Sequence, residues 1–569
     1  MTIMKALRKS IFGAGVVALS MGTLVSCIEE IDPQTSTVTV EQAINAPGSY
    51  DNFVANLTGN LCGQFIFTGN RVYDFGYAAF FLTRDVQGQD LVPVGTNNWF
   101  DTWYQDFTYL GPNWLVTQLP WRYYYGVIKD CNNVISQAGA SDYAEPAEPE
   151  KRVGAGIAYA LRAMYYLDLC RMYCAKPYVV GGDETLTTVK IVETIDLTNA
   201  AANPRMTWAE SFDFILKDLD TAEELLSGYE RADVYTPDVS VVYGLKARTY
   251  LEKRDWAKAE EYAKKAMAGY TMMTQDQYLS RDYGFNSPNS SWMFGLTFKS
   301  TDANILENDG DSSWGSVMLL ENGFDCGYAA NYGGPNVIDR HLYETIPETD
   351  FRKNCWVDFA LDELIDPEAE GPSDEMIEGL SKYSNYPERL YASGVDNASY
   401  GVGGLSLKFR NAAGKANTKY DAWVVAVPLM RVEEMKLIEA EAAGMQDEAR
   451  GKQLLTEFAK TRDPQYVYGR HNEAYYNTET SAFQNEVWWQ RRVALWGEGF
   501  ATFDIKRLNK GVIRSYAGTN HIEGSRFNSE VCPQWMTWCF VGTEADNNAA
   551  LVPNPNPIRP DGDSEEYAW

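Results

Sequence analysis

The sequence predicts a mainly α-helical protein, in which a tetratricopeptide-like helical-repeat scaffold carries a large irregular, loop-rich region. Three observations lead to this fold class. Apolar residues recur at helical spacing in several long stretches, and one stretch has the spacing of a tetratricopeptide repeat. Helical periodicity fades over residues 271–427, where Gly, Asn, Asp, Pro and Tyr dominate. A chain of 569 residues is longer than one hydrophobic core usually supports, so we expect two or more structural regions.

Residues 1–26 have the three parts of a secretory signal peptide. Three basic residues lie within positions 5–9, residues 11–19 form an apolar run, and small residues follow. That run is well short of the roughly 20 residues that span a bilayer, so we expect cleavage. The sequence Leu24-Val25-Ser26-Cys27 resembles a bacterial lipobox, in which Cys27 receives diacylglycerol and becomes the mature N-terminus. Residues 27–45 are therefore predicted to be the lipidated cysteine and its tether, and no transmembrane helix is expected elsewhere.

Residues 46–270 are predicted to form an N-terminal helical region. Amphipathic spacing indicates helices over residues 121–135, about 153–173 and 212–226. The tetratricopeptide spacing follows, in which small residues let two antiparallel helices pack closely. The residues that carry this spacing are Tyr243, Ala247, Tyr250, Ala259 and Ala266, with a turn at Asp255-Trp256. One such unit cannot bury its own face, so the other helices must pack against it.

Residues 428–515 are predicted to form a second helical region. Its helices are expected over residues 430–443, 450–461 and about 486–507, and residues 516–569 are expected to form C-terminal loops. The region between the two helical regions, residues 271–427, is too rich in aromatic residues for disorder. We expect it to consist of ordered loops that bind a ligand, because long irregular segments in compact proteins are usually functional.

Charge and cysteine content narrow the ligand and the compartment. The formal net charge of −29 disfavours nucleic acid, whose affinity comes from Lys and Arg, and it also disfavours an anionic membrane surface, so neutral ligands fit best. No C-x-x-C pair indicates zinc or a redox motif. Cys170 and Cys174 are interpreted as core residues, and Cys532 and Cys539 are candidates for a disulfide in an exported protein.

We expect no catalytic activity and no cofactor. The 3 His residues lack zinc-binding spacing, and neither a nucleophile elbow nor a P-loop is present. A glycosidase-like pair of carboxylates stays open, because among 78 acidic residues some pairs lie close by chance. Residues 308–311 and 561–563 are weak candidates for structural calcium, but neither matches the ligand spacing of an EF-hand.

Sugars present apolar C–H faces and rings of hydroxyl groups, so a sugar site needs aromatic platforms together with polar side chains on loops. Two stretches offer both kinds of side chain. The candidates of the first stretch are Asp74, Arg84, Asn98, Trp99, Trp103, Tyr109 and Trp114. The candidates of the second stretch are Trp292, Trp314, Tyr328 and Tyr332. Trp314 and Tyr328 are expected to be exposed platforms, whereas Trp99 and Trp103 fit one face of a buried helix equally well.

The whole pattern resembles the SusD/RagB family of nutrient-binding outer-membrane lipoproteins of Bacteroidetes. Acidic residues close to Cys27 resemble the surface-export signal of such lipoproteins. Besides the lipobox, the resemblance rests on Tyr125-x2-Ile128-x3-Asn132, Ala160-Leu161-Arg162-Ala163-x-Tyr165-Tyr166, Met430-Arg431-x2-Glu434-x4-Glu439-Ala440-Glu441-Ala442, and Arg491-Arg492-x2-Leu495-x2-Glu498-Gly499-x4-Asp504-x2-Arg507.

This resemblance implies four tetratricopeptide-like units, no catalytic activity, and a position on the cell surface as the lid of a SusC-like TonB-dependent transporter barrel. It also implies a glycan ligand, captured and delivered to that transporter. Two alternatives stay open. The same architecture captures a peptide or another nutrient, or the chain is a scaffold whose partner is a protein and whose aromatic residues are interface hot spots.

Overall fold

The computed structural model describes most of the chain after its N-terminal segment, and residues Tyr50–Trp569 form one compact unit. The described residues are 48–63, 71–94, 99–306, 312–322, 327–331, 333–416, 418–472 and 479–569. The predicted signal peptide, Cys27 and the tether up to residue 45 lie outside them. No helix among the described residues is long and apolar enough to cross a membrane.

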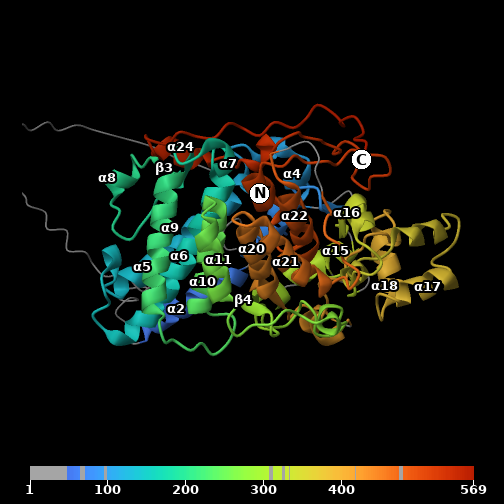
Figure 1. Cartoon of the computed structure of the whole chain (residues 1–569), viewed down its shortest axis with the longest axis horizontal. Coiled ribbons are helices and arrows are strands. Elements are labelled where there is room, and N and C mark those ends of the chain that lie inside the picture. The colour runs from blue at the N-terminus through green and yellow to red at the C-terminus, as the bar shows by residue number, and fades with distance from the viewer. Residues whose placement is uncertain are drawn as a thin grey trace, which may run out of the picture. The chain divides into compact units, whose positions relative to one another are not determined.

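Long helices build the scaffold, and they lie side by side in Figure 1. They are α5 (Leu115–Gln137), α6 (Arg152–Tyr173), α9 (Trp208–Leu225), α10 (Val239–Lys253), α11 (Trp256–Ala266), α20 (Val432–Gly444), α21 (Glu448–Lys460) and α22 (Ala482–Ala494). The helices predicted from periodicity are therefore confirmed as far as residue 494. Short helices outside the irregular region are α2 (Ser49–Gly59), α3 (Ala79–Asp85), α4 (Asp101–Tyr104), α7 (Tyr178–Gly181), α8 (Leu197–Ala200), α23 (Ala501–Leu508) and α24 (Gly542–Asn547).

Helices α10 and α11 form the predicted tetratricopeptide-like pair. Arg254 ends α10 in the left-handed conformation (φ 61°), and the Asp255 carboxylate caps α11 by accepting from the Lys258 backbone N–H. The rings of Tyr250 and Tyr262 stack between the two helices at 5.6 Å. Ala247, Ala259 and Ala266 are fully buried in the same core, as close helix packing requires.

The single helix predicted over residues 486–507 is wrong. The structure breaks it into α22 and α23 because Gly497 and Gly499 lie between them with φ values of +75° and +81°. A right-handed helix cannot pass through these dihedral angles, and residues other than glycine rarely adopt them. The break also lets the Glu498 carboxylate turn inward between the helices.

Three two-stranded antiparallel sheets join distant parts of the chain. Strand β1 (Leu91–Pro93) pairs with β5 (Asn336–Ile338), β2 (Leu186–Val189) pairs with β3 (Arg205–Thr207), and β4 (Trp292–Thr297) pairs with β6 (Ala426–Arg431). The β4–β6 pair brings the two ends of the irregular region together. That region holds the short helices α12 (Gln275–Tyr278), α13 (Ala303–Leu306), α14 (Trp314–Met318), α15 (Tyr328–Asn331), α16 (Arg340–Thr345), α17 (Asp374–Ser381), α18 (Pro387–Tyr391) and α19 (Lys419–Ala422).

Buried ion pairs hold the helices to one another, and most of them involve residues of the motifs described above. Arg162 on α6 donates to Asp218 on α9 (2.8 Å) and also pairs with Glu193. Other buried pairs join Arg248 to Glu434 (2.6 Å), Arg431 to Glu498 (2.7 Å), Arg491 to Asp504 (2.7 Å), Arg492 to Asp90 (2.6 Å) and Arg507 to Glu441 (2.6 Å). These motif residues therefore maintain the fold.

Of the two predictions about cysteines, one is confirmed and one is wrong. Cys170 and Cys174 are buried core residues, as predicted. The proposed disulfide between Cys532 and Cys539 is wrong, because both thiols are free in the structure. The Cys539 thiol instead donates to the carbonyl oxygen of Pro555 at 3.4 Å, within the folded C-terminal tail.

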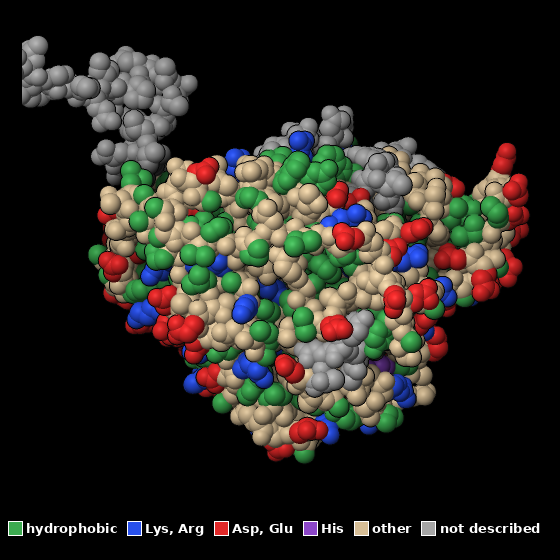
Figure 2. Space-filling model, turned by 90° about the horizontal axis from the view of Figure 1, so that it is seen from above, with side chains coloured by type: hydrophobic (Ala, Val, Ile, Leu, Met, Phe, Trp, Pro, Cys, Tyr) green, Lys and Arg blue, Asp and Glu red, His purple; other side chains and the backbone are tan. Residues whose placement is uncertain are grey.

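Figure 2 shows acidic and basic side chains interspersed over the face that it displays, with no continuous basic stripe on the described part of that face. This distribution agrees with the exclusion of nucleic acid from the net charge.

Candidate functional site

The best candidate for a ligand surface is the stretch of residues 99–114, which we call the aromatic loop. It contains α4 and a 3-10 helix (Phe107–Leu110) and leads directly into α5. Three large aromatic side chains on it are exposed: Trp99 (44%), Tyr109 (40%) and Trp114 (45%). Exposed tryptophan rings in so large a protein indicate a binding surface, because burial of these rings would otherwise stabilise the fold.

The exposed rings are held in fixed orientations by neighbouring side chains. Tyr109 and Trp114 meet edge to face, with ring centroids 4.5 Å apart and planes at 90°. Trp99 packs against Tyr73 at 6.1 Å, and the Arg71 guanidinium lies 5.8 Å from the Trp99 ring centroid. Contacts of these kinds stabilise aromatic rings and restrict their rotation, which lowers the entropic penalty of binding a ligand.

Buried aromatic residues anchor the loop from below. Trp103 on α4 is fully buried and meets Tyr73 at 5.2 Å. Phe107 stacks on Trp535 of the C-terminal tail at 4.9 Å. The loop therefore presents its exposed rings from a rigid base, an arrangement that favours specific binding.

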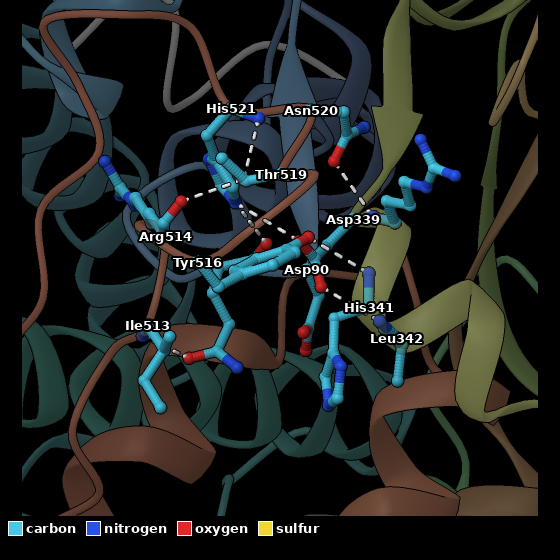
Figure 3. Close-up of polar contacts among 12 residues, drawn as sticks. Asp90, Asp339, His341, Leu342, Ile513, Arg514, Tyr516, Thr519, Asn520 and His521 are labelled. Carbon is cyan, nitrogen blue, oxygen red and sulfur yellow. Dashed lines mark hydrogen bonds and ion pairs between the residues drawn. The ribbon is translucent and has the colours of Figure 1, made fainter. Parts of the chain in front are cut away.

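Polar contacts with the C-terminal tail add a second anchor at the end of α4. Figure 3 shows the tail residues that make them, His521 and Arg514, with Asp339 and Tyr516 nearby. The hydroxyl group of Tyr104 lies 2.7 Å from Nδ1 of His521. Nη1 of Arg514 donates to the Tyr104 carbonyl oxygen at 2.6 Å. Both His521 and Arg514 are buried, so the tail fixes the position of α4.

The protonation of His521 follows from its neighbours. The Nε2 atom of His521 lies 3.1 Å from the carbonyl oxygen of Gln89. A carbonyl oxygen only accepts hydrogen bonds, so Nε2 carries the proton and Nδ1 accepts from the hydroxyl group of Tyr104. Burial lowers the pKa of His521, although Asp339, whose Oδ1 lies 3.5 Å from Nε2, acts in the opposite direction. The Asp339 carboxylate also accepts from the hydroxyl of Tyr516 at 2.5 Å. This histidine and this carboxylate are inaccessible to a substrate, and their partners give them a structural role.

Asp101 is the carboxyl group closest in sequence to the exposed Trp99. Burial, together with the nearby Asp106, raises the pKa of Asp101 to about 7. The Asp101 Oδ1 atom is buried and accepts no hydrogen bond from the described residues. A carboxyl group of this kind is able to act as a donor or as an acceptor near neutral pH. Asp101, Arg71 and Tyr73 were not predicted as site residues. Their proximity in sequence to Trp99 and Asp74 was the only available signal for them.

Several predicted platforms are buried. Trp103, Trp292, Trp314 and Tyr328 are each at most 1% exposed, so the expectation that Trp314 and Tyr328 stand on the surface is wrong. The Trp314 ring is enclosed by Phe409, whose centroid lies 4.9 Å away. These side chains fill the core of the irregular region and present no face to a ligand in this structure.

The predicted polar candidates Asp74 and Arg84 are buried as well. Arg84 donates to the Asp168 carboxylate at 2.9 Å, and the Tyr77 hydroxyl donates to the same carboxylate at 2.6 Å. Burial by itself raises the pKa of Asp168, but Arg84 and Arg171 outweigh it and lower that pKa. Arg84 therefore serves a buried ion pair and not a ligand.

Some of the remaining predicted positions lie among the described residues, and others lie outside them. Asn98, Tyr332 and the calcium candidate at 308–311 lie outside the described residues. In the other calcium candidate, the Asp563 carboxylate accepts from the backbone N–H groups of Gly524 and Arg526, as a turn cap does. The described residues contain no group of three or more His, Cys, Asp or Glu side chains arranged to hold a metal ion.

Comparison with known families finds a match to the SusD-like model described as "Starch-binding associating with outer membrane", over residues 87–251. None of the curated proteins compared with the chain matches it.

Solved structures share the fold over most of their length. A SusD-like carbohydrate-binding protein from Bacteroides vulgatus has a TM-score of 0.67 at 21% identity, covering 89% of this chain and 97% of its own. A SusD superfamily protein from Bacteroides thetaiotaomicron has a TM-score of 0.66 at 17% identity, covering 89% and 99%. Surface glycan-binding protein A from the same species, in complex with laminarihexaose, has a TM-score of 0.60 at 16% identity, covering 89% and 99%.

At these identities the likeness to solved structures establishes the fold, and residues 87–251 match the SusD-like family model. The resemblance drawn from the motifs is thereby confirmed: the chain is similar to SusD-like proteins in fold and, over residues 87–251, in sequence.

Proposed function

We propose that this protein is a cell-surface lipoprotein that captures glycans and delivers them to a SusC-like TonB-dependent transporter in the outer membrane. The observation that carries the proposal is the set of three exposed aromatic rings on the aromatic loop, at Trp99, Tyr109 and Trp114. Flat apolar rings beside hydrogen-bonding groups are suited to the C–H faces and hydroxyl groups of sugars. A glycan-binding protein of the same fold is known in complex with laminarihexaose.

The proposed location rests on separate observations. The lipobox at residues 24–27 would attach the chain to a membrane through acyl chains on Cys27, each buried methylene contributing about 0.8 kcal/mol. The matching family is described as associating with the outer membrane. Transfer of a captured glycan to a transporter barrel is the part of the proposal that this location permits, and we propose binding without catalysis.

Affinity electrophoresis tests the proposal with the chain that begins after Cys27, run against a panel of polysaccharides. We expect at least one glycan to retard the protein. Trp99→Ala and Trp114→Ala should each lower the affinity for that glycan, obtained from the retardation, about tenfold or more, as removal of an aromatic hot spot does. Tyr283→Ala is the matched control, because Tyr283 is exposed (63%) but belongs to a different segment.

Folding of each variant is checked by urea unfolding. Equal retardation of the wild type and both tryptophan variants would show that the aromatic loop does not bind the glycan. No retardation by any polysaccharide, together with retention of the protein by a peptide library, would replace glycan capture with peptide capture.

A further inference from the structure

A cavity lies between the end of α2, the segment 233–236, the end of β4 and the segment 299–304, and we call it the α2–β4 cavity. Its volume is about 610 Å³, within the roughly 300–1,000 Å³ typical of small-molecule pockets. None of its lining residues belongs to the aromatic loop. In Figure 1, α2 and β4 lie at the lower side of the view and α4 at the upper side.

The walls of this cavity are joined by hydrogen bonds between segments that are distant in sequence. The Cys62 thiol donates to the Thr297 carbonyl oxygen at 3.3 Å, and Nδ2 of Asn304 donates to the Cys62 carbonyl oxygen at 3.1 Å. The backbone N–H of Gly295 donates to the carbonyl oxygen of Val234 at 3.0 Å. The cavity is therefore preformed, so a ligand would not need to order its walls.

The side chains at the cavity combine donors, acceptors and an apolar face. Lys299 contributes an ammonium group that makes no ion pair with the described residues, whereas Asp233 and Asp302 contribute carboxylates. Tyr235 is half-buried, and Leu296 also lines the cavity. An ammonium group only donates and a carboxylate only accepts, so together they match a ligand that carries many groups of both kinds.

This composition disfavours several other ligand classes. Two carboxylates beside one ammonium group leave a net negative charge, which disfavours an anion. The ammonium group of Lys299 opposes a metal cation in the same space, and three charged side chains disfavour a purely apolar ligand. A neutral polyhydroxylated molecule fits this lining, because its hydroxyl groups donate to carboxylates and accept from an ammonium group.

We infer that the α2–β4 cavity is a second carbohydrate subsite, which takes a neutral sugar segment of one to three residues. This inference rests on the proposed glycan capture and extends it: the aromatic loop holds the glycan through ring faces, and the cavity holds sugar hydroxyl groups through Lys299 and Asp233.

Isothermal titration calorimetry tests the inference with neutral trisaccharides of glucose, mannose and xylose, which are too short to require both sites. For the trisaccharide that binds, we expect two sites on the wild type. Lys299→Ala should weaken one of them about tenfold or more, the effect of one charge-assisted hydrogen bond. Ala55→Trp should abolish that site, because Ala55 is an exposed helical residue in the cavity lining.

Two matched controls test whether loss of a lysine or addition of a tryptophan anywhere on the surface changes sugar binding. Lys460→Ala removes an exposed lysine on α21, and Ala257→Trp adds a large ring at an exposed position on α11; neither residue lines the cavity. Both controls should retain two sites.

The outcomes distinguish the two proposals. One site that is lost in Trp114→Ala but unchanged in Lys299→Ala and Ala55→Trp would overturn the cavity subsite and leave glycan capture by the aromatic loop intact. Binding lost only in the cavity variants would support the cavity and overturn the role of the aromatic loop. No binding of any trisaccharide, or of the polysaccharide panel, would overturn glycan capture and the subsite with it.

Discussion

Glu498 is a buried carboxylate that pairs with two buried cations. It lies between α22 and α23, where its carboxylate accepts from Nζ of Lys408 at 2.7 Å and from Nη2 and Nε of Arg431 at 2.7 and 2.9 Å. All three side chains are at most 4% exposed. Burial by itself raises the pKa of Glu498, but Arg431 and Lys408 outweigh burial and hold that pKa below its ordinary value.

The substitution Glu498→Gln keeps the size of the side chain and removes its charge. One amide oxygen still accepts, but the amide N–H₂ now faces donors. Lys408 loses its counter-charge, whereas Arg431 keeps its ion pair with Glu433 at 2.7 Å. Breaking a buried ion pair destabilises proteins by about 3–5 kcal/mol, and we expect a loss in this range. This loss is large against a total stability of about 5–15 kcal/mol.

Urea unfolding followed by tryptophan fluorescence measures the effect. We expect the unfolding midpoint of Glu498→Gln to fall by about 1 M or more, with the slope unchanged. The control is Glu344→Gln: Glu344 pairs with Arg340 on α16 in solvent, with both side chains more than 40% exposed, so its loss should stay within about 1 kcal/mol. Adding Lys408→Met to Glu498→Gln should restore part of the stability, because it removes one stranded charge.

The reasoning would be refuted by a Glu498→Gln variant that loses no more stability than Glu344→Gln. Additive losses in the Glu498→Gln, Lys408→Met double variant would also contradict it, since they would show that the two side chains do not interact.

Three further predictions concern the helix break and two titrating groups. Gly499→Ala should destabilise the fold by about 2 kcal/mol or more in urea unfolding, because its φ is +81° and a Cβ would lie 2.6 Å from Phe81. Gly518→Ala, with φ +79° and no atom near the Cβ, should lose only about 1 kcal/mol, and equal losses would exclude steric crowding at residue 499. The pKa of Asp101 in the folded state, about 7, is above its value in the unfolded state, so the stability of the fold falls as pH rises from about 4 through 7. The variant Asp101→Asn should therefore be more stable than the wild type at pH 8 and should lose that advantage at pH 4. The pKa of His521 in the folded state is below its unfolded value of about 6.5, so the stability of the fold falls as pH drops below about 6.5. If the stability of a His521→Gln variant changed with pH between 7 and 5 as that of the wild type does, this assignment would be contradicted.

The sequence predicted the helical scaffold well, because helical periodicity and turn residues act over short distances. The spacing at Tyr243 and Ala259 and the turn at Asp255 are local signals, and the structure retains each of them. The break at Gly497 and Gly499 was missed because glycine inside a periodic stretch is compatible with either a continued helix or a left-handed turn.

The candidate site was predicted less well, because exposure depends on contacts between distant segments. Trp314 has polar neighbours in sequence, yet Phe81 and Phe409 enclose its ring in the folded chain. Trp114 has similar neighbours but remains exposed at the entrance to α5. No local property separates these two tryptophans. For the charged motif residues, the sequence identified the residues but not their partners. Arg162 and Glu498 belong to motifs that are recognisable in the sequence, but their buried ion-pair partners are known only from the tertiary structure.

The central claim, that the aromatic loop captures glycans, is tested most directly by a crystal structure of the chain beyond Cys27 with the oligosaccharide that it binds. The account predicts sugar rings packed against Trp114 and Tyr109 or against Trp99, with the aromatic loop in the conformation described above. A sugar bound elsewhere, with all three rings facing solvent in the complex, would contradict it.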